Sequence, residues 1–210
     1  MTRLSLCWSP TSPYVRKVMI LAHETGLAGR IDLMAKNVWA ADTDIAATNP
    51  LGKVPALVLP DETVIFDSPV ILDYLDSLHG GPRLIPAEGP ARVKVLTVQA
   101  LADGILDAAV LTLLEGRRPA TEQSADWLAR QRRAVLRGLD ALEGQVAGFG
   151  PALEAEPINV GHITVLAALG YLDFRFAALD WRAGRPALAA WFARAAQRPS
   201  FLATVPKDPA

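Results

Sequence analysis

The residues NPLGKVP (49–55), ALVLPDETVIF (56–66) and DSP (67–69) decide how the first half of this chain folds. Ala56–Leu59 and Thr63–Phe66 are short apolar runs joined by Pro60-Asp61-Glu62, which predicts an antiparallel hairpin. Asp67-Ser68-Pro69 then places a proline in the first turn of a helix that runs to about Leu78. The segment is therefore predicted to be strand, turn, strand and helix.

The residues before this segment predict another strand and helix. Leu4–Trp8 alternates as a strand does. A helix over Pro13–Thr25 begins with Ser12-Pro13 and stops at Gly26. Ile31–Met34 reads as a second strand, and residues 36–49 form a loop with room for a short helix. The order strand, helix, strand, loop, strand, strand, helix predicts an α/β domain.

A turn-rich segment separates the two halves of the chain. Gly80-Gly81-Pro82 is followed by Pro86, Gly89 and Pro90, which is typical of a linker. We therefore expect domains at 1–79 and 88–210, joined by a linker at 80–87. The second half shows helical periodicity, for example on the apolar face of 127–146, and predicts an all-α bundle with helices at about 91–115, 122–147, 160–178 and 186–197.

Composition and charge exclude several classes of protein. The 21 basic and 22 acidic residues are mixed along the sequence, which argues against a nucleic-acid partner. Residues 95–114 are apolar but carry Gln99, Asp103 and Asp107, which favours a bundle helix over a membrane span.

Cysteine and histidine usage points to the compartment and argues against a metal site. Cys7 is the one cysteine and cannot form an internal disulfide, and the N-terminus does not read as a secretory signal, so we expect a cytoplasmic protein. The histidines, His23, His79 and His162, stand apart in the sequence, so no metal site is predicted.

Three motifs together resemble the glutathione transferase superfamily. They are SPTSPYVRK (9–17), NPLGKVP (49–55) and DSP (67–69), and the first is similar to the T-S-P-[FY]-V-R-K run of small bacterial members. The resemblance covers essentially the whole chain. It implies a thioredoxin-like N-terminal domain, an all-helical C-terminal domain and glutathione as co-substrate. It also implies a role in detoxification and a homodimer, with Leu51, its neighbours and the first helix of the C-terminal half at the interface.

Ser12 is the candidate catalytic residue. An ordinary thiol with a pKa near 8.5 is only a few per cent ionised at neutral pH, so a transferase site must lower that pKa by roughly two units, about 2.7 kcal/mol. A hydroxyl donating to a charged group contributes about 1.5–3 kcal/mol, and a helix N-terminus adds about 0.3–1. Ser12 stands where the family places its catalytic Ser or Cys. Thr11, Ser9 and Tyr14 are alternatives, and Ser12 has a purely structural alternative as a helix cap.

The resemblance also implies the residues that hold glutathione. Val54-Pro55 resembles a cis-proline turn whose backbone pairs with the cysteinyl part, although an ordinary trans-proline would suit the dipeptide alone. Asp67 would bind the γ-glutamyl ammonium group, and Ser68 with the helix N-terminus would bind the carboxylate. The family more often has Glu at the position of Asp67.

The remaining candidate contacts rest on less specific patterns. Lys53 or Lys36 would pair with the glycyl carboxylate, although solvated surface lysines are common. Trp8 and Tyr14 would contact an apolar electrophile.

One helix start departs from the family pattern. Where the family has a Ser/Thr-x-x-Asp capping box, this chain has Asn159-Val160-Gly161-His162. Asn159 can still serve as the N-cap, but His162 replaces the acid. We expect this change to weaken a folding feature and to leave the chemistry intact.

The function expected from these residues is glutathione conjugation to a small apolar electrophile. Two alternatives stay open: a glutathione-dependent isomerase or dehalogenase, and a non-catalytic binding or scaffold protein with this fold. Thiol-disulfide chemistry is disfavoured because a serine at position 12 cannot form a mixed disulfide.

Overall fold

The computed structural model describes residues 3–150 and 158–208. The chain divides into two compact units: residues 88–198 form one, and residues 1–87 with 199–210 form the other. This division differs from the domains expected from sequence in two places. Residues 80–87 lie inside the first unit, and the tail that begins at Pro199 returns to the first unit.

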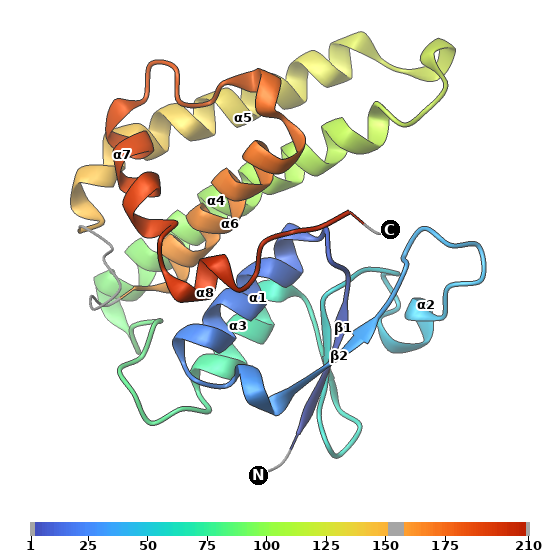
Figure 1. The fold of residues 1–210 in the computed structure, drawn as a ribbon, viewed down its shortest axis with the longest axis vertical. Coiled ribbons are helices and arrows are strands. Elements are labelled where there is room, and N and C mark those ends of the chain that lie inside the picture. Colours follow the sequence, from blue (N-terminus) through green and yellow to red (C-terminus); the bar gives the residue numbers. More distant parts are fainter. Residues whose placement is uncertain (1–2, 151–157, 209–210) are drawn as a thin grey trace. The chain divides into compact units, whose positions relative to one another are not determined.

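The first unit contains a four-stranded sheet in the order β2-β1-β3-β4 (Figure 1). The strands are β1 (Leu4–Trp8), β2 (Ile31–Ala35), β3 (Ala56–Val58) and β4 (Val64–Ile65). β1 is parallel to β2 and antiparallel to β3, and β3 is antiparallel to β4. The predicted hairpin is therefore confirmed.

Three helices complete the α/β part of this unit: α1 (Pro13–Glu24), α2 (Ile45–Thr48) and α3 (Ser68–Asp76). α1 packs on α3. Their buried faces carry aliphatic side chains that meet the sheet residues, as the helical periodicity of the sequence predicts. The fully buried aliphatic side chains of this core include Leu6 and Leu57 on the strands and Val18, Ile20, Leu21, Ile71, Leu72 and Leu75 on the helices.

Asp76, at the end of α3, holds the segment that was expected to be a linker. Its fully buried carboxylate accepts hydrogen bonds from the backbone N–H groups of Leu84 and Ile85, at 2.8 and 3.0 Å. Nε of Arg83 donates at 2.8 Å, and Nε2 of His79 lies at 3.0 Å. Burial opposes ionisation of Asp76, but these hydrogen bonds outweigh it and hold its pKa below the ordinary value. Residues 80–85 are consequently pinned to α3.

The second unit is a helical bundle of α4 (Gly89–Glu115), α5 (Ala125–Gln145), α6 (Val160–Arg175) and α7 (Pro186–Ala195), as the periodicity predicts. α6 is its centre, because every residue from Val160 to Leu172 is buried. By length and composition alone α4 could cross a membrane, but it packs closely against α5 and α6, as the core helix of a bundle does.

The altered capping box at the start of α6 still caps the helix. Oδ1 of Asn159 accepts the backbone N–H of His162 at 3.0 Å, which confirms Asn159 as the N-cap. Nδ2 of the same side chain lies 3.2 Å from Nε2 of His162. The imidazole packs against the rings of Phe149 and Trp191, with centroids 4.9 and 5.9 Å away. His162 therefore packs against aromatic rings at the position where the acid of a capping box would accept the N-cap N–H.

We expect His162 to make the protein sensitive to acid. Burial, followed by the charges of Arg198 and Lys94, lowers its pKa from 6.5 to about 4. Because the folded-state pKa lies below the unfolded one, stability is present above pH 6.5 and is lost as the pH falls toward 4. The expected loss between pH 7.5 and pH 5 is about 2 kcal/mol. Urea unfolding at the two pH values measures it.

His162→Gln is the matched variant, because glutamine keeps a polar side chain that does not titrate. Its stability should change between pH 7.5 and pH 5 by about 2 kcal/mol less than that of the wild type. Equal pH dependence in both proteins would assign the acid sensitivity to other groups.

Candidate functional site

The strand register brings the three sequence motifs to one end of the sheet. Cys7 pairs with Ala56 in the antiparallel β1–β3 ladder, so the residues after Trp8 lie beside those before Ala56. Leu57 pairs with Ile65, so Asp67 follows β4 at the same end. The N-termini of α1 and α3 begin there, directly after Ser12 and Asp67. Backbone N–H groups at two helix starts make this end suited to anions.

Ser12 is the N-cap of α1 and is half-buried. Its Oγ accepts the backbone N–H of Val15 at 3.3 Å, and Pro13 occupies the first helical turn. A hydroxyl accepts through its lone pairs and donates through its O–H, so the cap leaves the O–H proton available. Capping and hydrogen-bond donation to a ligand are therefore compatible roles for this residue.

Thr11 and Ser9, the alternative hydroxyls, lie in the turn that leads into Ser12. The N–H of Ser12 donates to the carbonyl of Ser9 at 3.3 Å, which closes a four-residue turn through Pro10 and Thr11. Both alternative hydroxyls belong to half-buried residues. Ser12 alone of the three stands at the helix N-terminus, where the helix dipole favours negative charge.

The Val54–Pro55 peptide bond is cis, which confirms the prediction made from the motif. The segment before it is held by Asn49, which is 2% exposed. Nδ2 of Asn49 donates to the carbonyl of Lys53 at 2.8 Å, and Oδ1 accepts the N–H of Leu51 at 3.0 Å. Gly52 has φ +65°, a conformation that favours glycine, within this closed loop. Asn49 positions this loop, a role that its place at the start of the motif did not reveal.

Asp67 and Ser68 stand at the start of α3. Asp67 is the N-cap, and its side chain is exposed and makes no capping hydrogen bond. The Phe66–Asp67 peptide bond is also cis. Ser68 is 2% exposed. An exposed carboxylate beside a helix N-terminus can bind an ammonium group while the helix N–H groups bind a carboxylate.

The structure distinguishes the two candidate lysines. Nζ of Lys36 lies 2.6 and 2.7 Å from the carboxylate oxygens of Asp44, and this hydrogen-bonded pair raises the pKa of Lys36 and lowers that of Asp44. Lys53 is exposed directly before Val54. Lys53 is therefore the better placed of the two for a second carboxylate.

Trp8 is the last residue of β1 and Tyr14 lies in the first turn of α1, and both are half-buried. They lie at the same sheet end as Ser12.

Cys7 is fully buried in β1, and burial raises the pKa of its thiol. Within residues 3–150 and 158–208, no three His, Cys, Asp or Glu side chains gather as metal ligands would.

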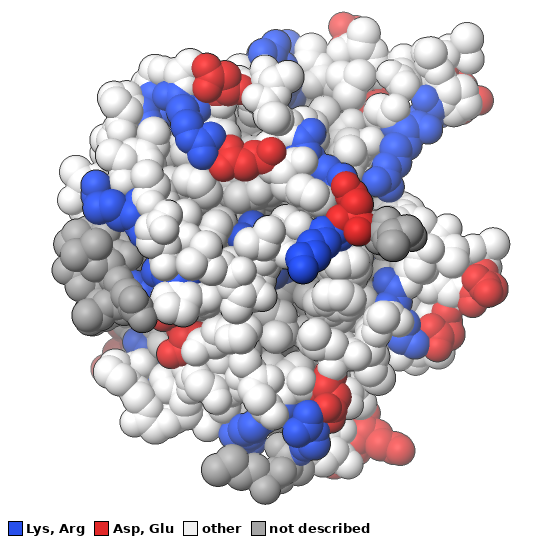
Figure 2. Space-filling view, in the orientation of Figure 1, with Lys and Arg blue, Asp and Glu red and all other residues white. Residues whose placement is uncertain are grey.

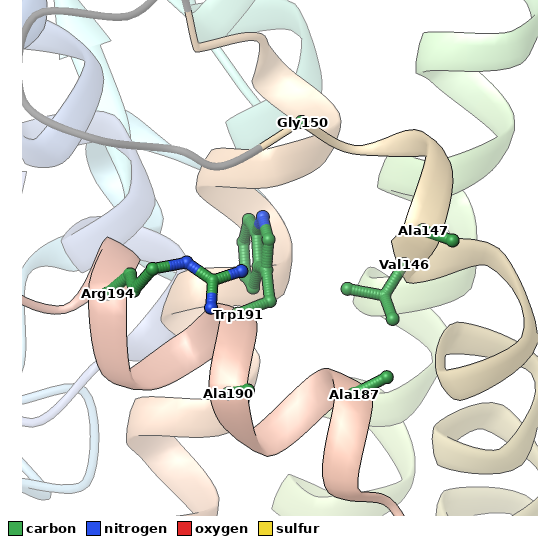
Figure 3. A pocket seen from close by; sticks show the side chains of 7 residues that line it. All are labelled: Val146, Ala147, Gly150, Ala187, Ala190, Trp191 and Arg194. Carbon is green, nitrogen blue, oxygen red and sulfur yellow. The ribbon is translucent and has the colours of Figure 1, made fainter.

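Two hollows lie in the helical unit, and neither contains a residue predicted for the site. One of about 380 Å³ lies between α7 and the turn after α5, with Trp191 and Arg194 in its wall (Figure 3). The other, of about 620 Å³, lies between α4, α5 and the end of α6, with Leu172 and Phe176 in its wall. The candidate site thus rests on the strand ends and helix starts of the first unit.

Lys and Arg side chains lie among Asp and Glu side chains on the face that Figure 2 shows.

Comparisons with known proteins agree with this architecture. Residues 11–78 match the model of the glutathione S-transferase N-terminal domain, and residues 125–194 match that of the C-terminal domain. The chain is 38% identical over 203 residues to the uncharacterized GST-like protein YibF of Escherichia coli K12, covering 97% of this chain and 98% of that protein.

Solved structures extend the likeness to ligand-bound proteins. A glutathione transferase family member from Pseudomonas fluorescens Pf-5, crystallised with bound glutathione, is 46% identical with a TM-score of 0.92 over 98% of this chain and 100% of that chain. A crystal structure of a family member from the same strain holds S-(propanoic acid)-glutathione; it is 46% identical, with a TM-score of 0.87 over 97% of this chain and 100% of that chain.

Proposed function

Since the chain belongs to the glutathione S-transferase family, we propose that it binds glutathione and activates its thiol through the hydroxyl of Ser12 for attack on a small apolar electrophile. The observation that carries the proposal is the position of Ser12 as the N-cap of α1, with its oxygen accepting from Val15 and its proton left to donate. A donor and a helix N-terminus aimed at one sulfur both favour the thiolate.

The magnitudes are adequate for this role. A hydrogen bond to a charged group contributes about 1.5–3 kcal/mol, and a helix N-terminus contributes about 0.3–1. Together they match the roughly 2.7 kcal/mol needed to bring a thiol pKa from about 8.5 to about 6.5. No general base is required, because the thiol releases its proton to solvent before the electrophile reacts.

The rest of the tripeptide can be assigned to residues at the same end of the sheet. The backbone of Val54 would pair with the cysteinyl part, next to the cis bond to Pro55. Asp67 would bind the α-ammonium group, and Ser68 with the N–H groups of α3 would bind the α-carboxylate. Lys53 would pair with the glycyl carboxylate. In this arrangement the positive ammonium group of the ligand would contact Asp67, and its negative glycyl carboxylate would contact Lys53.

Conjugation is favoured among the family's reactions by the ligand of a relative. The protein solved with S-(propanoic acid)-glutathione holds a thioether of glutathione, the type of product that conjugation to carbon gives. A serine at position 12 also excludes a mixed disulfide at this position.

We extend the proposal to a homodimer. The exposed side chains of Leu51 and Val93 (64% and 65% exposed) are available for it on the surfaces that the resemblance implies.

The proposal predicts that Ser12→Ala raises the pKa of bound glutathione by one unit or more. Transfer to a model electrophile such as 1-chloro-2,4-dinitrobenzene should then fall about 5- to 50-fold at pH 6.5. Calorimetric titration of glutathione gives the affinity, and the thiolate absorbance against pH gives the thiol pKa.

Two further variants separate the roles of the cap and the hydroxyl. Ser12→Asp keeps an N-cap acceptor but lacks the donor, so it should keep the thermal stability of the wild type and lose thiolate stabilisation. If Thr11→Ala raises the thiol pKa and Ser12→Ala does not, Thr11 is the donor. Wild-type protein that binds no glutathione would favour the non-catalytic alternative.

A further inference from the structure

The C-terminal tail packs along α1 within the first unit. Its short helix α8 (Pro199–Leu202) contacts α1, as Figure 1 shows. The hydroxyl of Ser200 donates to Glu24, in the last turn of α1. The guanidinium of Arg16 lies 3.9 Å from the centroid of the Phe201 ring and donates to the Phe201 carbonyl at 3.3 Å. The tail therefore runs from the end of α1 toward its start.

Beyond α8 the tail reaches the turn that precedes Ser12. The backbone N–H of Lys207 donates to the carbonyl of Pro10 at 3.4 Å. Pro10 and Thr11 are the two central residues of the turn closed between Ser9 and Ser12. In such a turn the central peptide is the one that rotates between turn types, and here that peptide carries the Pro10 carbonyl. The tail thus contacts the rotatable peptide of the turn.

Two of the bonds that hold Ser12 from within its own segment are long, whereas the Ser12 carbonyl accepts the N–H of Arg16 at 3.0 Å. The N–H of Ser12 lies 3.3 Å from the Ser9 carbonyl, and its Oγ lies 3.3 Å from the Val15 nitrogen. Both exceed the usual range of about 2.7–3.2 Å for N–H···O bonds. The Lys207 bond to the Pro10 carbonyl, at 3.4 Å, is also long, so it adds to these two bonds and does not replace them. Catalytic groups need placement within about 0.5 Å, which no single weak bond secures. The three bonds together therefore hold the turn that precedes α1.

We infer that the backbone N–H of Lys207 is a positioning group for Ser12: it fixes the Pro10–Thr11 peptide and thereby the direction of the hydroxyl. This inference rests on the proposed function, because it assigns the tail a part in thiol activation. The side chain of Lys207 is exposed and has no part in it. The anchors at Glu24 and Arg16 hold the start of the tail against α1.

Substitution of Lys207 tests the inference because the donor is a backbone group. Lys207→Pro removes the N–H, whereas Lys207→Ala keeps it. In Lys207→Pro we expect the pKa of bound glutathione to rise by about half a unit to one unit and kcat/KM at pH 6.5 to fall roughly two- to fivefold. Lys207→Ala should retain both values. A chain ending at Pro206 lacks the donor without adding a proline and should behave like Lys207→Pro.

Hydrogen exchange of residues 9–12 in the free protein separates this inference from the proposed function. Faster exchange in Lys207→Pro and in the chain ending at Pro206, but not in Lys207→Ala, supports the restraint even if glutathione does not bind. Unchanged exchange in all three variants overturns it. If exchange changes but the thiol pKa and kcat/KM stay at wild-type values, the tail orders the turn without positioning Ser12, and the inference fails while the proposed function stands.

Discussion

Asp76→Ala should lower the free energy of unfolding of the first unit by about 3–5 kcal/mol. The fully buried carboxylate accepts from the N–H groups of Leu84 and Ile85 and from the side chains of His79 and Arg83. Loss of the carboxylate leaves the N–H groups of Leu84 and Ile85 without this acceptor, and Ile85 is only 1% exposed. Urea unfolding at pH 7 measures the total, and hydrogen exchange at Leu84 and Ile85 locates it.

Asp73→Ala is the matched control on the same helix. Asp73 is half-exposed and lies 4.0 Å from Arg83, so its removal should cost less than about 0.5 kcal/mol. Because the pKa of Asp76 is lowered in the folded state, its contribution is present above the ordinary carboxyl pKa and is lost as the pH falls through the folded-state value. Equal losses in the two variants would show that residues 80–85 do not depend on Asp76.

The role of Asp76 explains why residues 80–87, which were expected to be a linker, belong to the first unit. Glycine and proline over residues 80–90 are typical of a flexible connection, and the partner that fixes this one is a single acid at the end of a helix. From sequence alone, a carboxylate in the last turn of a helix is expected to be solvated. Here it is buried because residues 84 and 85 fold back and donate to it. The place of the tail after Pro199 could not be predicted for a similar reason, because its anchors Glu24 and Arg16 are more than 170 residues away in the sequence.

The site was more predictable than these connections because it rests on local rules and on register. Ser12-Pro13 and Asp67-Ser68-Pro69 are helix starts that short-range sequence preferences reveal. Once the strands pair, these starts and the cis-proline meet at one sheet end without further specification. The inward turn of Asn49 could not be foreseen from local rules, since asparagine is usually exposed in a loop.

Gly161→Ala should destabilise the helical unit by about 2–4 kcal/mol. A Cβ on Gly161 would lie 2.9 Å from the carbonyl oxygen of Val95 and 3.0 Å from Cβ of Val98, both on α4. It would also lie 3.1 Å from Oδ1 of Asn159, the oxygen that caps α6. Backbone cannot step aside as a flexible side chain can. The added methyl group must therefore move α6 away from α4 or displace the cap.

Two other helical glycines in the same unit provide the controls, because their surroundings differ in a graded way. A Cβ on Gly104 meets nothing within 4 Å, so Gly104→Ala should stabilise the unit by about 0.5–1 kcal/mol. A Cβ on Gly138 would lie 2.6 Å from Cγ1 of Ile105, a buried and β-branched side chain, so Gly138→Ala should cost about 1–3 kcal/mol. Thermal unfolding of the three variants should place Gly161→Ala and Gly138→Ala below the wild type and Gly104→Ala above it. If Gly161→Ala proves as stable as the wild type, close backbone approach is not what holds α6 against α4.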